Sequence, residues 1–292
     1  MRFKDQTAEL HFSEQGFVKI DHFIDDVQLK LLLDLYYKSG LGKTNGKMYT
    51  NLQDLNYEES VAIEEAIIKI CTKSVDVYLE NYRIINAGFL IKGIGKNSDS
   101  RLHQDWSIVD ESKFRSALLW IPLIDVDEKN GCIQVIPQSH NWFQTIRSFS
   151  IHSLFLKFNY KINPFLKALP LKTGEAVMFF SKLFHGSKQN YSDVERPCIT
   201  ITIIDENADF IHYLKSNEST IKVLSCTKEF IYQYSFKEKN TENAESLTLL
   251  KNIENPEEYI LTDKLFLKRL YIEKSKVNIV HRLILKIINF FS

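Results

Sequence analysis

The sequence has few cysteines, and their spacing excludes the common cysteine-based sites. Its 292 residues contain four, Cys71, Cys132, Cys198 and Cys226, and no two of them form a CxxC pair. Neither a zinc knuckle nor a disulfide framework is therefore expected. The thiols are predicted to be reduced and mostly buried.

The chain also lacks long hydrophobic runs and an excess of charge of either sign. It has no run of the ~18 apolar residues that a membrane helix needs, and residues 1–17 carry charges throughout, so neither a transmembrane segment nor a leader peptide is expected. Lys plus Arg equals Asp plus Glu at 37 each, so no overall field attracts nucleic acid or an anionic membrane. We expect a cytoplasmic protein that acts on a small molecule and does not bind nucleic acid.

Apolar residues are abundant enough for a large core. They make up 44% of the chain, and aromatic residues make up 12%. Barrel enzymes of this length are commonly one domain, and we see no internal repeat or low-complexity linker. We expect a single domain over residues 1–292, with a helical part at about 1–83, a β core at about 84–205 and a C-terminal extension at about 206–292.

Two segments in the first third of the chain have helical patterns. Residues 25–38 begin with aspartates suited to an N-cap and are followed by Gly40, a plausible helix stop. From Glu58 to about Tyr82, apolar residues recur mostly at helical spacing between Glu and Lys residues. We predict one helix in each segment.

Beyond Tyr82 the chain turns to short runs rich in β-branched and aromatic residues, which predict strands: AGFLIKGI, SALLWIPLI, GCIQVIP, EAVMFF and CITITII. Asn130 and Gly131 lie between the second and third runs and tolerate the positive φ of a tight hairpin, so antiparallel pairing is expected there. Residues 140–171 are too many for a simple turn. They are predicted to be a partly helical insertion that covers one mouth of a barrel.

His103 and Asp105 form a candidate metal site with His185. The first two lie two residues apart in RLHQDWSIV, so on an extended strand both side chains project from one face. His185 follows another strand-like run, from which it can supply a second imidazole. Two histidines and one carboxylate on one face of an octahedral ion leave three positions open, which suits Fe(II) that activates O2. For an isolated His-x-Asp pair, ordinary hydrogen bonding is the alternative.

Arg196 is a candidate anchor for a co-substrate. A turn-rich stretch separates it from His185, and a hairpin centred near Asn190 would place the two residues directly opposite each other. A guanidinium there can bind the distal carboxylate of a dicarboxylate whose other end chelates the iron, which fits 2-oxoglutarate. The alternative is a surface ion pair between Arg196 and Glu195 or Asp193.

Four motifs follow one another along the chain: HQD at 103–105, LLWIPLIDVDEKNGCIQVIPQSH at 118–140, TGEAVMFF at 173–180 and HGSKQNYSDVERP at 185–197. In order and spacing they resemble the phytanoyl-CoA dioxygenase family of Fe(II)/2-oxoglutarate oxygenases, over roughly residues 10–205. The resemblance implies a mainly β core, a double-stranded β-helix (jelly roll, cupin-like) with flanking α-helices. It also implies that O2 and 2-oxoglutarate are consumed and that succinate and CO2 are released.

The same resemblance assigns roles to individual residues. It implies that His103, Asp105 and His185 ligate iron, and that Arg196 binds the distal carboxylate of 2-oxoglutarate with help from Ser187.

Two further residues match the family less specifically. Lys92 corresponds to a lysine on an early strand that approaches 2-oxoglutarate, and Trp120 to an aromatic residue that lines the metal pocket; each is equally compatible with a core or surface role. The related halogenases lack the carboxylate found here at Asp105, which favours hydroxylation. A cupin-like metal enzyme that does not use 2-oxoglutarate and a non-catalytic binding protein on the same barrel remain as alternatives.

The last residues of the chain match no motif. Residues 277–291 place apolar side chains near helical spacing with a basic remainder. We predict a terminal helix docked on the barrel; contact with a membrane surface or with an acidic carrier domain is the alternative.

Overall fold

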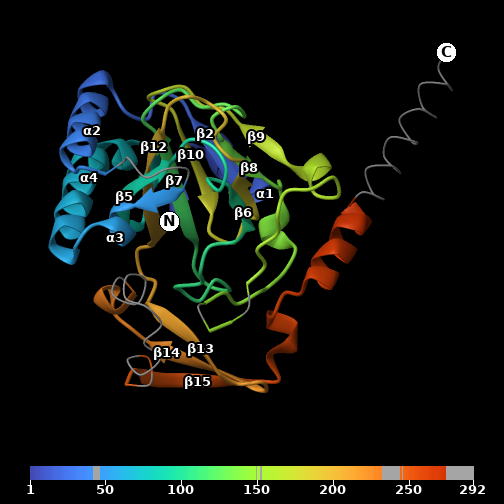
Figure 1. Cartoon of the computed structure of the whole chain (residues 1–292). Coiled ribbons are helices and arrows are strands. Elements are labelled where there is room, and N and C mark those ends of the chain that lie inside the picture. Colours follow the sequence, from blue (N-terminus) through green and yellow to red (C-terminus); the bar gives the residue numbers. More distant parts are fainter. Residues whose placement is uncertain (42–46, 149, 152, 232–243, 245, 274–292) are drawn as a thin grey trace, which may run out of the picture.

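Two antiparallel sheets form the centre of the protein (Figure 1). The computed structural model describes residues 1–41, 47–148, 150–151, 153–231, 244 and 246–273. The larger sheet has six strands in the order β2 (Phe17–Ile20), β10 (Ala176–Phe180), β7 (Ser116–Pro122), β12 (Arg196–Asp205), β5 (Tyr82–Lys92) and β3 (Met48–Thr50). The smaller sheet has four, β6 (Ser100–His103), β11 (His185–Ser187), β8 (Ile133–Val135) and β9 (Lys167–Leu169).

Strand order identifies the fold. From β5 to β8, and again from β10 to β12, successive strands alternate between the two sheets. This alternation is that of the predicted double-stranded β-helix, or jelly roll. The five predicted strands are present as β5, β7, β8, β10 and β12.

The same alternation corrects one prediction. Gly131 has a φ of 81°, as a tight turn requires, but β7 and β8 lie in different sheets and do not pair. The hairpin predicted at Asn130 and Gly131 is therefore wrong. These residues instead carry the chain from the larger sheet to the smaller one.

Helices cover the outer face of the larger sheet (Figure 1). They are α1 (Gln6–Gln15), α2 (Asp26–Lys38), α3 (Asn51–Asp54) and α4 (Tyr57–Tyr78). Both predicted helices are present. Asp25 caps α2 in a capping box with Gln28, as its position suggested. Helix α4 ends before the predicted Tyr82 because the chain there enters β4 (Leu79–Glu80), which pairs with β1 (Arg2–Phe3), and then β5.

Side chains of β12 alternate between the helices and the interior of the jelly roll. Ile199 pairs with Phe89 of β5, and the Phe89 ring centroid lies 5.6 Å from that of Tyr36 on α2, so this face meets the helices. Arg196 and Thr202 lie on the opposite face. That face is buried at Arg196 and half-buried at Thr200 and Thr202, which is why isoleucine alternates with threonine in the middle of CITITII.

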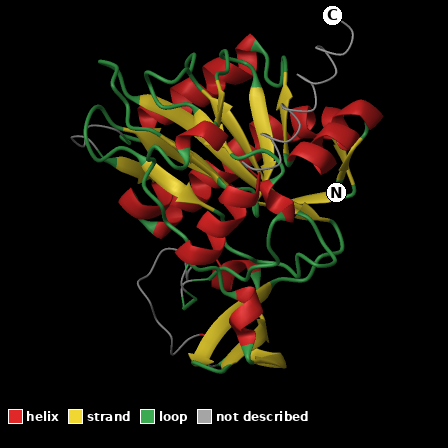
Figure 2. Ribbon diagram, turned by 90° about the vertical axis from the view of Figure 1, so that its right-hand side faces the viewer, coloured by secondary structure: helices red, strands yellow, loops and turns green. Residues whose placement is uncertain are grey.

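A three-stranded sheet follows the jelly roll, below it in Figures 1 and 2. Its strands are β13 (Ile211–Asn217), β14 (Thr220–Ser225) and β15 (Thr248–Glu254). It shares a small core with the 140–171 segment through Ile146, Ile151, Tyr213 and Val223. The short helical turn Pro256–Tyr259 and a helix at residues 263–273 follow.

The 140–171 segment differs from its prediction. Its described residues hold no α-helix, only the 3-10 turns Ser139–Asn141 and Asn163–Phe165 and the strand β9. It lies across the smaller sheet because its Trp142 and Phe143 pack against Phe184 there.

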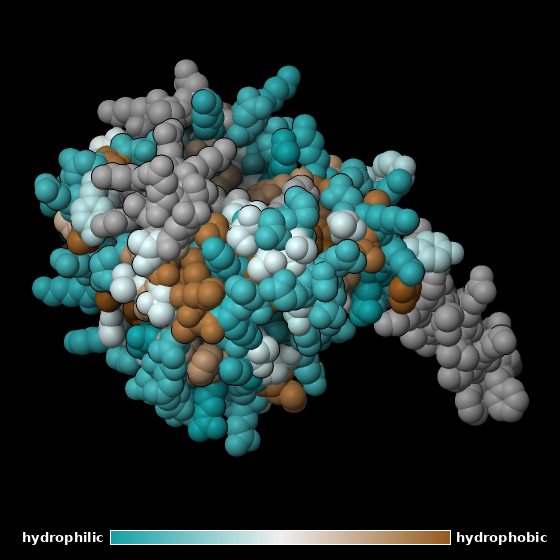
Figure 3. All heavy atoms as spheres, turned by 90° about the horizontal axis from the view of Figure 1, so that it is seen from below, coloured by the Kyte–Doolittle hydropathy of each residue, from teal (hydrophilic) through white to brown (hydrophobic). Residues whose placement is uncertain are grey.

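The surface seen from below is mostly hydrophilic, with several hydrophobic patches, one of them an elongated cluster left of the centre (Figure 3). Across the described residues, no helix combines the length and apolar character needed to cross a membrane. The helix predicted at 277–291 lies outside the described residues. Cys71, Cys132, Cys198 and Cys226 are free thiols, as predicted, and only Cys226 is not fully buried.

Candidate active site

Three predicted ligands meet at the mouth of the jelly roll. His103 ends β6 and is the direct cross-strand partner of His185 on β11. Asp105 follows just beyond the end of β6, where its backbone N–H donates to the carbonyl of Ser181 at 2.8 Å. The ligand atoms of the three side chains all lie within 4.8 Å of one another.

Hydrogen bonds orient both imidazoles. Nδ1 of His103 lies 2.7 Å from the carbonyl oxygen of Arg101, and Nδ1 of His185 lies 2.9 Å from that of Leu183. A carbonyl only accepts, so each Nδ1 carries the hydrogen and each Nε2 presents a lone pair. Burial, with His185 alongside, lowers the pKa of His103 to about 4, which favours its neutral, ligating form.

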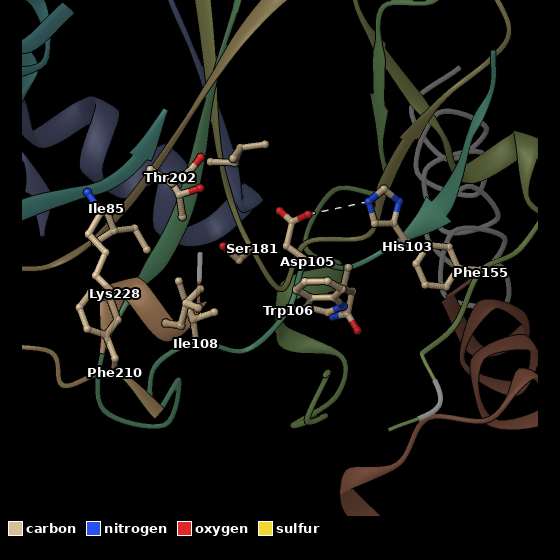
Figure 4. A pocket seen from close by; sticks show the side chains of 14 residues that line it. Ile85, His103, Asp105, Trp106, Ile108, Phe155, Ser181, Thr202, Phe210 and Lys228 are labelled. Atoms are coloured by element: carbon tan, nitrogen blue, oxygen red, sulfur yellow. Dashed lines mark ion pairs between the residues drawn. The ribbon is translucent and has the colours of Figure 1, made fainter. Parts of the chain in front are cut away.

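The two lone pairs point toward a carboxylate. Nε2 of His103 lies 3.8 Å from Asp105 Oδ1 (Figure 4), and Nε2 of His185 lies 3.7 Å from the same oxygen. Asp105 Oδ2 is buried and has no hydrogen-bond partner. Three acceptors face one another without a donor, an arrangement that a bound cation would satisfy. The residues therefore fit a metal with nitrogen and oxygen ligands.

A buried ion pair fixes the backbone at the carboxylate ligand. The Arg147 guanidinium donates to both carboxylate oxygens of Glu111 at 2.7 Å, and its Nε donates to the carbonyl of Asp105, also at 2.7 Å. Arg147 is 3% exposed. Between the two ligands, Gln104 donates to the carbonyl of Lys182 and accepts from Thr145, which holds the ligand segment from its other side.

Aromatic rings enclose the histidines. Phe155 is stacked on His103 with ring centroids 5.4 Å apart and planes 8° apart, and Phe179 lies 4.6 Å from the ring of His185. Phe155 comes from the 140–171 segment, so that segment does cover the site, as predicted. Sequence reasoning missed Arg147, Glu111 and Phe155, which no motif marks, and gave Phe179 no role although it lies in the motif at 173–180, because their contacts join distant parts of the chain.

Arg196 occupies a different position from the one predicted. Its strand β12 belongs to the larger sheet and His185 to the smaller, so the two residues are not opposed across a hairpin. The direct partner of Arg196 is Lys92 on β5. Both lie on the interior face, and both are essentially inaccessible to solvent, at 1% and 0% exposed. The surface ion pair considered for Arg196 does not form, because Glu195 instead accepts from the hydroxyl of Tyr49.

The two buried cations form no salt bridge with any described residue. Arg196 donates to the sulfur of Cys198 at 2.9 Å, its carbon Cζ lies 5.0 Å from the ring centroid of Trp120, and its Nε has no hydrogen-bond partner. Lys92 donates only to the backbone carbonyls of Ser98 and Lys188. Burial and then the nearby guanidinium lower the pKa of Lys92 to about 6. A buried anion is the partner that these groups lack.

Trp120 and Ser187, the remaining predicted residues, have defined positions, as does His140 at the end of the motif at 118–140. Trp120 is fully buried on β7 and stacks with Arg196. Ser187 is buried on β11, two residues beyond His185. His140 contacts the carbonyl of Ser13 through Nε2 at 3.0 Å and stacks on a ring of the core, so it fixes a loop.

A cavity of about 390 Å³ opens beside the ligands. Figure 4 shows Asp105 between His103 and Phe155 on one side and a wall that includes Thr202 and Phe210 on the other. The carboxylate ligand thus stands at the edge of a space large enough for a small molecule.

The chain is similar to known proteins of one family. The family model of phytanoyl-CoA dioxygenase (PhyH) matches residues 12–198. Phytanoyl-CoA dioxygenase 1 of Oryza sativa subsp. japonica is 28% identical over 126 residues, which cover 42% of this chain and 44% of that protein. Phytanoyl-CoA dioxygenase domain-containing protein 1 of Danio rerio is 28% identical over 145 residues, which cover 47% and 48%. The chain spans about half the length of these curated relatives.

Solved structures show the same fold. HygX from Streptomyces hygroscopicus, with nickel and 2-oxoglutarate bound, has a TM-score of 0.50 and 12% identity and covers 68% of this chain and 86% of that one. The epimerase SnoN in complex with Fe3+, alpha ketoglutarate and nogalamycin RO has a TM-score of 0.50 and 14% identity and covers 70% and 85%. Since the family model matches well over half of the chain, and the match includes all three predicted ligands, the protein belongs to the phytanoyl-CoA dioxygenase (PhyH) family.

Proposed function

We propose that this protein is an Fe(II)- and 2-oxoglutarate-dependent oxygenase that hydroxylates a C–H bond of a small molecule. The observation that carries the proposal is the donor-free set His103, Asp105 and His185, on a barrel whose interior also holds two buried cations without a carboxylate partner. Family membership supports it, as do the iron and 2-oxoglutarate bound to proteins of the same fold.

The metal would be held by Nε2 of both histidines and by the carboxylate of Asp105. This donor set is that of the 2-His-1-carboxylate centres of non-haem Fe(II) oxygenases. The carbonyls of Arg101 and Leu183 hold the imidazoles in the ligating tautomer before a metal arrives.

The co-substrate would be held at its distal carboxylate by Arg196 and Lys92, with Ser187 as a further contact. Trp120 supports the guanidinium from one side. Because both side chains are already desolvated, a bound carboxylate would meet them at little further cost in lost hydration, and Lys92 would take up a proton as the anion binds. Bound there, iron and 2-oxoglutarate supply the oxidising chemistry: O2 and 2-oxoglutarate are converted to succinate and CO2 with one oxygen atom delivered to the substrate.

The protein's own contribution is position and exclusion of water. Phe155 and Phe179 pack against the two histidines. Arg147 and Gln104 together fix the backbone that runs from His103 to Asp105. The adjacent cavity would hold a substrate against the Asp105 side of the centre. Which C–H bond reacts is then set by how the cavity holds the substrate.

Two alternative functions differ in which of these residues they require. A cupin-like metal enzyme that does not use 2-oxoglutarate has no use for Arg196 and Lys92 buried without a carboxylate. An oxygenase with another outcome, as in the epimerase SnoN, would use the same centre and differ in substrate pose.

The proposal is tested in two steps. Anaerobic addition of Fe(II) and 2-oxoglutarate is expected to give the visible charge-transfer band of the chelated co-substrate, and His103→Ala is expected to abolish it. With O2 and a panel of candidate substrates, succinate release should then rise above the substrate-free rate, with hydroxylated product found by mass spectrometry. A metal-loaded protein that shows no band and no succinate would overturn the proposal.

A further inference from the structure

The cavity beside Asp105 is built from two distant parts of the chain. The jelly roll supplies Asn86 from β5, Leu118 from β7 and Thr202 from β12. The segment that follows the jelly roll supplies Phe210 and Ile231. The shape of the cavity therefore depends on residues beyond the family match, which ends at residue 198.

Contacts with the jelly roll hold this segment in place. The backbone N–H of Ile211 donates to the carbonyl of Ile108 at 3.0 Å, and the Arg83 guanidinium lies over the ring of Phe210 at 5.2 Å. Lys228 lines the cavity, and its ammonium is 2.7 Å from Glu64 of α4. In Figure 4 the Lys228 nitrogen lies at the end of the cavity remote from His103.

The Glu64–Lys228 pair neutralises the one charge that the described lining residues carry apart from the candidate metal ligands. Glu64 is 5% exposed, and burial raises the pKa of its carboxyl although Lys228 counteracts this. Apart from Lys228 and the candidate metal ligands, the described lining residues carry no charge. The described lining thus holds no free cation for a carboxylate or phosphate and no free carboxylate for an ammonium group.

Two polar side chains of the lining remain available. Asn86 and Thr202 are direct cross-strand partners, and neither side chain forms a hydrogen bond with any described residue. Among the other uncharged polar groups, Gln104 bonds with Lys182 and Thr145, Ser181 bonds with Ser116 at 2.9 Å, and Trp106 has a contact of its own. An amide and a hydroxyl side by side on an otherwise apolar wall can bind one neutral oxygen function.

We propose that the chamber takes an uncharged, mainly hydrocarbon body that bears one neutral hydroxyl or carbonyl group, bound by Asn86 and Thr202, and that Phe210 and Ile231 set its length. That such a molecule is the substrate rests on the proposed function. That it binds in the cavity does not, so the binding proposal and the proposed function can fail separately.

The test is a binding assay with three probes of one size: octan-2-one, octanoate and octylammonium. Calorimetry on the full-length protein, loaded with Fe(II) and 2-oxoglutarate under anaerobic conditions, is expected to show octan-2-one binding about tenfold or more tightly than either ion, because a buried unpaired charge is costly. Tighter binding of octanoate or octylammonium, or no binding of the ketone to a folded, metal-loaded protein, would overturn the proposal.

Three variants test its parts. Thr202→Val should weaken octan-2-one binding several-fold and leave the hydrocarbon probe 1-octene unchanged. Phe210→Ala should shift the binding preference from octan-2-one toward the longer decan-2-one. Leu249→Ala, at an exposed position of β15, should not. Equal loss for ketone and hydrocarbon in the first variant, or an unshifted length preference in the second, would contradict the assigned roles.

Glu64→Gln gives the sharpest result. This change frees the Lys228 charge in the lining, so octanoate should bind several-fold more tightly than to the natural protein, while octan-2-one should be unaffected. Octanoate affinity that stays unchanged in a folded variant would show that Lys228 does not control the charge of the chamber. Succinate release, measured in parallel, reports the proposed function separately.

Discussion

Lys92 of β5 and Arg196 of β12 are direct cross-strand partners on the interior face of the jelly roll, and both are buried without a salt bridge to any described residue. Two adjacent desolvated cations disfavour the charged form of the weaker acid, which is why the pKa of Lys92 falls to about 6. Burial of this pair lowers the stability of the ligand-free protein, and a bound anion would offset that loss.

The first prediction concerns the affinity for 2-oxoglutarate. Arg196→Met should raise its Kd roughly thirtyfold or more, because loss of one partner of a buried charge pair costs on the order of 2–5 kcal/mol. Anaerobic titration of the Fe(II) protein measures this. Lys172→Met, which removes an exposed lysine, serves as the control. An unchanged Kd would remove Arg196 from the co-substrate site.

The second prediction is a pH dependence of stability without 2-oxoglutarate. Lys92 has a pKa of about 6 in the folded protein against an ordinary value of 10.5, so between these values the unfolded chain binds a proton that the folded chain lacks. The penalty from Lys92 is therefore full below about pH 6, fades as pH rises and is gone above 10.5.

The measurement compares Lys92→Met with the natural protein by urea unfolding from pH 6 to 9.5. The stability advantage of the variant over the natural protein should shrink steadily as pH rises. Two curves that stay parallel across this range would show that Lys92 keeps its proton in the folded state.

The third prediction concerns the Arg147–Glu111 pair. The double change Arg147→Gln with Glu111→Gln removes both charges together, so no unpaired buried charge is left. Because Arg147 holds the carbonyl of Asp105, Fe(II) affinity should fall about 10–100-fold, the usual effect of losing an outer contact of a metal ligand. Chelator competition measures the affinity, and the matched change Lys215→Gln with Glu218→Gln, at an exposed ion pair, is the control. An equal loss of affinity in the control would make the effect nonspecific.

Local patterns were sufficient to predict helices α2 and α4, the main strands and the three candidate ligands, but not α1 or α3. The capping box of helix α2 is formed by residues close together in the sequence. His103 and Asp105 are two residues apart, so their side chains can converge at the end of a strand whatever the remaining strands do. The positions of Asn130, Gly131 and Arg196 could not be predicted in this way. Each depends on which sheet the next strand joins, and that choice is made by packing between segments far apart in sequence.

The cavity walls were beyond sequence reasoning for the same reason. Phe210 and Lys228 lie in a segment without a motif, and only the folded chain brings them opposite Asn86 and Thr202. A single contact, between Lys228 and Glu64, joins residues 164 positions apart. We propose that residues 206–273 belong functionally to the same domain as the jelly roll, since they complete its cavity.

The last prediction concerns Asp105, whose Oδ2 is buried without a partner beside two imidazole lone pairs. Asp105→Gly removes the carboxylate among the three ligands and leaves space next to His103 and His185. We expect hydroxylation to be lost and the space to accept a halide ion, while 2-oxoglutarate still binds, because Lys92 and Arg196 lie on the other sheet. Product analysis by mass spectrometry with and without chloride, together with 2-oxoglutarate titration, measures all three effects. Asp105→Glu, which keeps the charge, should retain part of the metal affinity that glycine loses. Undiminished hydroxylation by the glycine variant would show that Asp105 is not a ligand.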